Sequence, residues 1–338
     1  TNSTGNYNAA FGRSALLNNT TASENSGFGW GALYTNSTGA KNTAVGKEAL
    51  ANNTTASNNT AVGYQAGYTV STSQYNAFLG YQAAYGGNCQ AVTAVGYKAG
   101  FQDATTNGAV YVGYQAGYGN TSGASNVALG TVSLTSNSTG SYNTAVGHAA
   151  LQANTTASNN TAVGYQAGYS NTTGYYLAAV GNGALFSNTT GHDNSAVGLN
   201  CLTLNTTGSY NTAIGSQALN NNTTASSNTA VGYQAGYSIT TGANNTCIGY
   251  QAGYTNNTGS GSNTCVGYQA GYYNTGTTGT AANTFIGYQA GYYSVGGYYN
   301  TFVGTASGSL ITSGAQNTIL GQYNGNQGGL DIRTASNY

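Results

Sequence analysis

The sequence predicts an all-β protein, a parallel β-solenoid or β-roll of about 19 rungs with a 17-residue repeat. The main observation is a phrase, Asn-Thr-Ala-Val-Gly-Tyr-Gln-Ala-Gly-Tyr, that recurs at 59–68, 160–169 and 228–237. Its first glycine, called the anchor here, defines 19 copies, and 15 of the 18 intervals between anchors are 17 residues. The anchors are Gly12, Gly29, Gly46, Gly63, Gly80, Gly96, Gly113, Gly130, Gly147, Gly164, Gly181, Gly198, Gly215, Gly232, Gly249, Gly267, Gly287, Gly304 and Gly321.

Composition is the second observation. The 338 residues include 53 Gly and 31 Tyr but only 10 charged residues, no Pro and no Met. Such a composition is compatible with disorder, but the strict period argues for order. Because the composition is uniform, we expect one repeat array over 1–325, followed by an exit segment, 326–338, that leads to a downstream region. The missing Met and signal-peptide pattern suggest a fragment or a processed form.

Each repeat is expected to hold two short strands, Asn-Thr-Ala-Val and Tyr-Gln-Ala-Gly-Tyr, with the anchor at the bend and Asn-Thr-Thr in the return loop. The residue before the anchor is apolar in every copy, for example Phe11, Val45 and Leu320, and is expected to face a core. The Thr two residues earlier should point inward with it, which argues against the outward Thr rows of ice-binding solenoids. Three residues after the anchor, Ala in 15 copies predicts a tight site.

Two further columns carry predictions. Asn stands four residues before the anchor in 16 copies, and a stacked column of Asn predicts a side-chain amide ladder. Tyr directly after the anchor is always accompanied by Gly or Ala three residues later, as in Tyr64 with Gly67, and never by Leu. A volume exchange would explain this, so the Tyr ring is expected to lie over the Gly.

Asn-Thr-Ala-Val/Ile-Gly followed two residues later by Ala resembles the head repeat of trimeric autotransporter adhesins, which implies a left-handed parallel β-roll of three chains side by side. The longer unit with Asn-Thr-Thr-Gly connectors more closely resembles repeats of bacteriophage tail-fibre-like proteins. The stretch from Gly321 to Tyr338 is similar to the exit from such repeats, where some fibres continue into further strands and a self-cleaving chaperone domain.

The column two residues before the anchor predicts self-association. It is mostly Ala and becomes Cys247, Cys265, Phe285, Phe302 and Ile319 toward the C-terminus. Because it alternates with the expected core column, it should form an exposed apolar stripe, together with much of the Tyr. Burial of that stripe against sister chains predicts a homotrimer.

The sequence offers no catalytic, cofactor-binding or metal-binding residues, and an enzyme is not expected. The histidines, His148 and His192, lack convergent ligands, and Asp193 beside His192 suits a solvated loop. Cys89 and Cys201 are expected to be small buried or loop residues, and the stacked Cys247 and Cys265 are expected to be free thiols rather than a disulfide.

Two surface features have alternative interpretations. The sequons at Asn53, Asn154, Asn171, Asn188, Asn205 and Asn222 fit either glycosylation or, preferably, turn chemistry. The sparse charges gather in the first third and are expected to be solvated; these residues are Arg13, Lys41, Lys47, Glu48, Lys98 and Asp103. A net charge near zero indicates neither nucleic acid nor a membrane as partner, and no apolar run is long enough to cross a bilayer.

The leading functional prediction is the rigid shaft of a viral fibre, a phage tail or head fibre on the virion surface that supports host attachment by an absent tip. The first alternative is a bacterial cell-surface trimeric adhesin whose Tyr-rich flank binds glycans. The second is an extracellular fibril that grows end to end through exposed terminal rungs.

Overall fold

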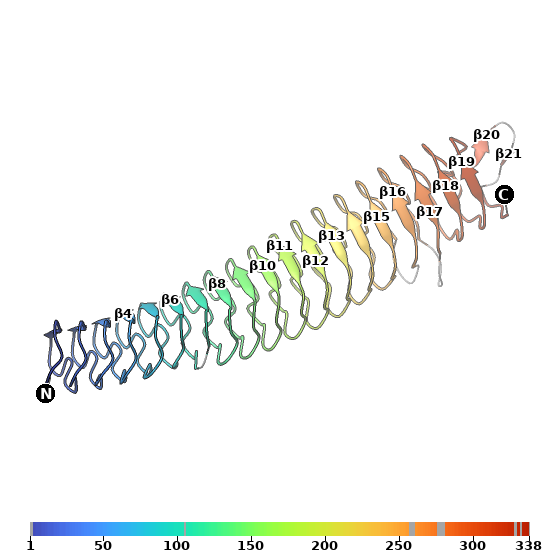
Figure 1. The fold of residues 1–338 in the computed structure, drawn as a ribbon. Helices are drawn as coiled ribbons and strands as arrows, with labels where there is room; N and C mark the ends of the chain where they lie inside the picture. Colours follow the sequence, from blue (N-terminus) through green and yellow to red (C-terminus); the bar gives the residue numbers. More distant parts are fainter. Residues whose placement is uncertain are drawn as a thin grey trace. The chain divides into compact units, whose positions relative to one another are not determined.

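A computed structural model of the chain describes residues 3–104, 106–256, 261–275, 281–327, 330–331 and 333–337. The chain divides into two units, residues 1–166 and 167–338, and each unit is a parallel β-solenoid with a repeat of about 17 residues (Figure 1). The predicted all-β class, parallel pairing and repeat length are therefore confirmed.

Unit 1 contains ten three-residue strands, and successive strands from β1 to β10 pair in parallel. The strands are β1 (Ala9–Phe11), β2 (Ser26–Phe28), β3 (Thr43–Val45), β4 (Thr60–Val62), β5 (Ala77–Leu79), β6 (Thr93–Val95), β7 (Val110–Val112), β8 (Val127–Leu129), β9 (Thr144–Val146) and β10 (Thr161–Val163).

Unit 2 repeats this arrangement with nine strands and ends in a short antiparallel pair. The strands are β11 (Ala178–Val180), β12 (Ser195–Val197), β13 (Thr212–Ile214), β14 (Thr229–Val231), β15 (Thr246–Ile248), β16 (Thr264–Val266), β17 (Thr284–Ile286), β18 (Thr301–Val303), β19 (Thr318–Leu320), β20 (Asn326–Gln327) and β21 (Leu330–Asp331).

Among the described residues each copy holds one strand, so the expected second strand at Tyr-Gln-Ala-Gly-Tyr is wrong. That segment is a turn in which Gln65 and Gly67 have φ of 51° and 61°. Alternate residues in the left-handed region cannot form a strand. Leu50 takes the same conformation, with φ of 49°, because its side chain is fully buried in the core.

The anchor glycines allow neighbouring rungs to approach closely. Gly29 has a φ of 136°, and a Cβ there would lie 2.5 Å from the carbonyl oxygen of Gly46. The same geometry recurs along both units, so this position requires glycine for both its φ and its space.

The core lies on the opposite side of the strand from the side we expected. Val45, directly before an anchor, is 37% exposed, whereas Ala44 is fully buried. From β2 to β19 the residue two before the anchor points inward and is buried, and the residues one and three before it point outward; in β1, the terminal strand, all three residues are exposed. In the copy of Ala44 the interior space beside the strand is taken by the fully buried Leu50 of the following turn, which suits a small inward residue on the strand.

The volume exchange that we expected between the outer Tyr and the Gly takes place inside the core, between other residues. A Cβ on Gly67 would meet Phe78 and Leu50, and one on Gly100 would meet Tyr111. Phe78 and Tyr111 belong to the inward strand column, so the core exchanges Leu in the turn for a large residue on the strand. The expectation that an outer Tyr lies over the Gly is wrong.

The predicted amide ladder is present, and a second ladder runs beside it. In the first, the backbone N–H of Asn42 donates to Asn25 Oδ1 at 2.9 Å. In the second, seven residues after each anchor, Asn53 Nδ2 donates to Asn36 Oδ1 at 2.6 Å. Asn42 Nδ2 and Asn53 Nδ2 both donate to the carbonyl oxygen of Ala56, which joins the two ladders.

The expected exit segment returns to the last rung. Asn317 Nδ2 donates to the carbonyl oxygen of Ala335 at 2.8 Å, and the backbone N–H of Asn337 donates to that of Ala315 at 2.9 Å. These bonds repeat those that join the return loops of successive copies, such as Asn300 Nδ2 to the carbonyl of Gly314. Residues 333–337 thus cover the return-loop edge of the last rung.

Candidate functional site

The outward face of the strands is a regular array of hydroxyl and methyl groups. In β3 and β4, Thr43 pairs with Thr60 and Val45 pairs with Val62, so like residues stack in register. Twelve of the 19 copies have Thr in the outer threonine column, and every copy has Val, Ile, Leu or Phe in the outer apolar column. Isoleucines in the apolar column, such as Ile214 and Ile248, are about two-fifths exposed. This apolar stripe replaces the Ala stripe that we expected to be exposed.

Aromatic residues form two outer ladders on the turn that follows the anchor. The first ladder contains Tyr64, Tyr81, Tyr97 and Tyr114, with ring centroids 5.1–5.2 Å apart. The second contains Tyr68, Tyr85, Phe101 and Tyr118, with spacings of 5.0–5.2 Å. Unit 2 repeats both ladders.

Stacking inside these ladders covers the ring faces. Tyr68 and Tyr85 are inclined by only 5°, so the two rings present their edges to solvent. Because carbohydrate rings stack on aromatic faces, a continuous ladder offers little for a glycan to bind. Glycan binding all along the Tyr-rich flank, as the adhesin alternative supposes, is therefore disfavoured.

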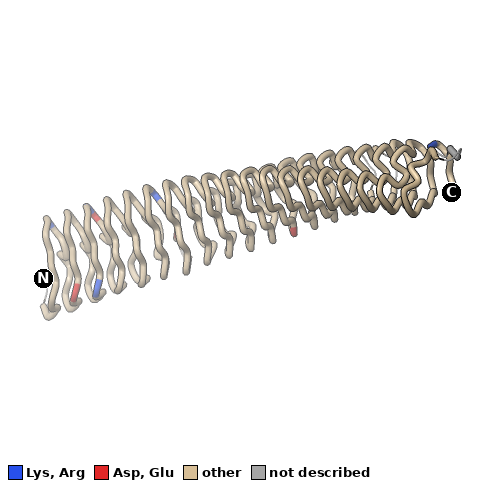
Figure 2. Tube along the Cα trace, turned by 90° about the horizontal axis from the view of Figure 1, so that it is seen from above, with Lys and Arg blue, Asp and Glu red and all other residues tan. Residues whose placement is uncertain are grey.

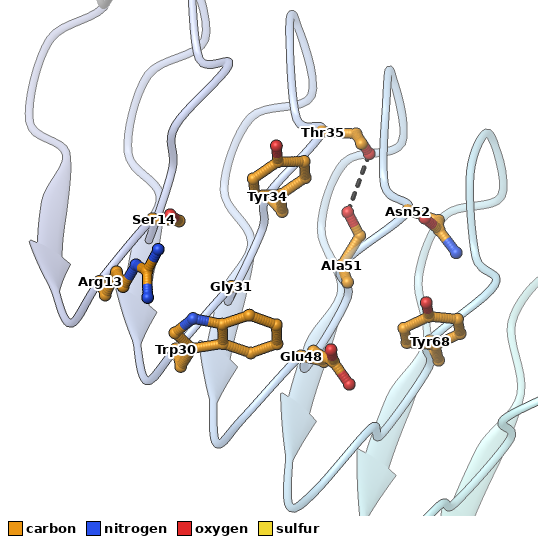
Figure 3. A pocket seen from close by; sticks show the side chains of 10 residues that line it. All are labelled: Arg13, Ser14, Trp30, Gly31, Tyr34, Thr35, Glu48, Ala51, Asn52 and Tyr68. Atoms are coloured by element: carbon orange, nitrogen blue, oxygen red, sulfur yellow. Dashed lines mark hydrogen bonds between the residues drawn. The ribbon is translucent and has the colours of Figure 1, made fainter.

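One of the interruptions of the second aromatic ladder is a single residue, Ala51, which stands between Tyr34 and Tyr68 (Figure 3). A pocket of about 460 Å³ opens there. Its lining residues are Arg13, Ser14, Trp30, Gly31, Tyr34, Thr35, Glu48, Ala51, Asn52 and Tyr68. All belong to the first four copies, and Trp30 is the only tryptophan of the chain.

The pocket gathers charges in a chain that has few. Charged residues are sparse, and several lie near the N-terminus (Figure 2). Lys47 Nζ lies 5.0 Å from the centroid of Trp30 and 5.6 Å from that of Tyr64, where it takes the place of a ring in the first ladder. Glu48 Oε2 accepts a hydrogen bond of 2.7 Å from Gln65 Nε2. Arg13, Lys41 and Lys47 are exposed, as expected of solvated charges, and of the charged residues Arg13 and Glu48 line the pocket.

Asp103 contradicts the solvated interpretation outright, because it is fully buried. It occupies the second Asn ladder, and Thr106 Oγ1 donates to its Oδ1. Its Oδ2 has no hydrogen-bond partner among the described residues. Burial raises the pKa of Asp103 to about 7, against the lowering effect of the Thr106 hydrogen bonds.

The interior around Asp103 contains two more titratable groups. Burial, and then the charge of Asp103, raise the pKa values of the Cys89 thiol and the Tyr111 hydroxyl. Tyr111 Oη accepts a hydrogen bond of 2.8 Å from Asn120 Nδ2. This closed cluster has the character of a packing irregularity in the copies around Gly96 and not of a catalytic centre.

The two histidines, which the sequence analysis considered as metal ligands or catalytic residues, lie apart from each other. His148 stacks on Tyr165 at 5.3 Å, and His192 stacks on Tyr175 at 4.8 Å and contacts Asp193 at 2.8 Å. Within the described ranges, no three His, Cys, Asp or Glu side chains are placed to hold a metal ion. No helix among these residues could span a membrane.

The cysteines and the sequons are buried. All four cysteines are free thiols, and Cys247 and Cys265 pair in register on β15 and β16. The six sequon asparagines belong to the second amide ladder and are fully buried, which leaves no room for a glycan on them. The turn interpretation of these sequons is the one compatible with the fold.

Comparisons with known protein families, with curated proteins and with solved structures found no match.

Proposed function

We propose that this chain is a structural fibre shaft that works as a side-by-side homotrimer. The observation that carries the proposal is the outer apolar column, which repeats on every strand of both units and is left exposed by a single chain. Isolated patches of exposed apolar residues are normal, whereas a stripe that continues over many rungs marks an interaction surface. The in-register pairing suits a second and third copy of the same stripe.

The shaft function follows from how each rung is held. Every described copy shares strand hydrogen bonds, amide ladders or aromatic stacks with its neighbour, so bending would break many contacts at once. A spacer that holds a tip away from a surface needs this stiffness and no reactive group. The virion surface, as in a phage tail or head fibre, is supported by the resemblance of the repeat alone; a bacterial surface adhesin and an extracellular fibril are the alternatives.

Sedimentation of the purified chain tests the trimer. We expect a species of three times the chain mass, and we expect the double variant Val45→Lys, Val62→Lys to sediment as a monomer. A matched control is Thr55→Lys, which adds a charge on an exposed return loop. A stable wild-type monomer at micromolar concentration, or a trimer that tolerates the double variant, would contradict the proposal.

A second candidate function, ice binding, is favoured by one observation. The Thr of the strand faces outward beside the apolar column, which removes the reason for excluding it. Rows of hydroxyl and methyl groups at the strand spacing of about 4.8 Å form a flat, repetitive surface. Because trimer formation would cover this face, a monomer that inhibits ice recrystallisation would favour ice binding, and a trimer without that activity would favour the shaft.

A further inference from the structure

We propose that the gap at Ala51 in the second aromatic ladder is a binding slot for a single hexopyranose unit of a glycan. This inference concerns a site on the side of the shaft and does not depend on the trimer.

The slot has the size of one six-membered ring. The second ladder places one ring on each rung, 5.1 Å from the next in the pair Tyr68 and Tyr85. Tyr34 and Tyr68 are two rungs apart, so their rings are separated by about 10 Å with Ala51 between them. Among the 19 copies, this is the one place where a single non-aromatic residue interrupts two aromatic neighbours.

The ring faces that are covered elsewhere are available here. Tyr85 covers one face of Tyr68, and the other face looks into the slot. Tyr34 is 40% exposed and has Leu17 and Ala51 as its neighbours in the column, not aromatic rings. Two opposed aromatic faces bind the C–H groups on both sides of a pyranose chair, which an edge-on ladder cannot do.

The rim of the slot selects a hydroxylated ring over an apolar one. Arg13 from the first copy, and Glu48 and Asn52 from the third, line the pocket around the slot (Figure 3). Glu48 uses one carboxylate oxygen for Gln65, which leaves the other as an acceptor, and Arg13 and Asn52 supply donors. An apolar ring would make no hydrogen bond with these groups, whereas the hydroxyls around a sugar would pair with them.

Gly31 contributes by its lack of a side chain. The corresponding position is Gln in many copies, where it builds a ladder of side-chain amides such as Gln82 Nε2 to Gln65 Oε1 at 2.8 Å. At Gly31 that ladder is absent, and the pocket extends from Ala51 to Trp30 and Arg13. The missing Tyr and the missing Gln therefore open one cavity together.

The test uses Trp30 as a built-in reporter. Methyl glycosides of glucose, galactose and mannose are titrated into the full chain while Trp30 fluorescence is followed, and ligand-observed saturation-transfer NMR serves as a second readout. For a ligand of this size we expect saturable binding with a dissociation constant on the order of 1 mM. At least one glycoside should bind.

Ala51→Tyr is the decisive variant, because it completes the ladder with the residue that other rungs carry. We expect it to fold, with an unchanged or higher melting temperature, and to weaken glycoside binding at least tenfold. Gln152→Tyr is the matched control, since it adds a Tyr in the same column beside Tyr169 and leaves the slot open. Tyr34→Ala removes one ring face and should also weaken glycoside binding. It provides a second test if Ala51→Tyr does not fold.

Three results would overturn the proposal. One is the absence of saturable binding by every glycoside well above the millimolar range. Another is equal affinity in wild type and in the variants that fill or open the slot. The last is tighter binding of p-cresol than of any glycoside, which would show that the slot receives an aromatic ring from another chain.

Discussion

Replacing the buried Asp103 by asparagine should stabilise the protein at alkaline pH and change little in acid. Burial raises the folded-state pKa of Asp103 from 3.8 to about 7. Below pH 3.8 the carboxyl is protonated in both states, and its contribution is fully present. As the pH rises from 3.8 toward 7, the unfolded chain releases the proton first, so stability is lost progressively through the folded-state pKa.

The size of the effect follows from the shift. About three pKa units correspond to about 4 kcal/mol, which the wild type loses between pH 4 and pH 8 through this residue. Asp103→Asn removes the titration and restores the ladder residue of the other copies. In the copy of Asn120, the amide donates to the carbonyl of Gly123 at 2.9 Å, and the new amide has the equivalent carbonyl of Thr106 available.

The assay is urea unfolding of wild type and Asp103→Asn at a series of pH values from 4 to 8. The difference in unfolding free energy between the two proteins should grow by several kcal/mol toward pH 8, with the variant the more stable. Glu24→Gln, at an exposed position, removes one charge without touching the interior and is the control. Parallel pH profiles for wild type and Asp103→Asn would refute the argument, because they would show that the buried carboxyl costs nothing when ionised.

Three further substitutions or treatments test the packing. Gly46→Ala places a methyl group against the carbonyl of Gly63 at a φ of 130°, and thermal unfolding should show a loss of more than about 1 kcal/mol; no loss would mean that the rungs can separate. Phe302→Ala empties a fully buried site and should cost about 3–5 kcal/mol in chemical unfolding, whereas a loss below about 1 kcal/mol would contradict the assigned inward direction. Cys247 and Cys265 should resist alkylation in the native protein and react after denaturation, as measured by mass; rapid native labelling would show that β15 and β16 face solvent with this column.

The sequence predicted the period, the parallel pairing, the anchor and the first amide ladder, because each depends on a residue type that recurs at one position. It did not predict which strand face is buried. Both Ala44 and Val45 are apolar, and alternation only places them on opposite sides. The buried face can be identified by comparing two columns, the residue two before the anchor and the residue four after it. The turn has Leu50 where the strand has the small Ala44, and Gly291 where the strand has the large Phe285.

The slot at Ala51 was hidden for a related reason. A small residue in a column of tyrosines indicates a gap only if the rings of that column stack on one another, and the sequence analysis placed this column in a second strand and predicted no stack for it. Once the structure shows that this column stacks ring on ring, the same alignment shows an open place between Tyr34 and Tyr68. Neither the outer direction of the Tyr nor that of Val45 follows from hydrophobicity alone.

The second amide ladder, which contains Asn36 and Asn53, also explains why the interior uses asparagine and so few charges. In a stack of identical rungs, each side chain must donate to one neighbour and accept from the other, and an amide does both. Where Val70 and Ile239 replace the Asn, the ladder stops, and the Oδ1 atoms of Asn53 and Asn222 in the preceding rungs have no partner. A carboxylate accepts only, and Asp103 Oδ2 has no hydrogen-bond partner among the described residues, while burial raises the pKa of this carboxyl to about 7. An apolar residue ends the amide ladder and leaves one buried oxygen atom without a hydrogen bond. A buried charge instead lowers the stability of the fold by an amount that depends on pH. An interior of stacked rungs therefore selects against charge at every copy.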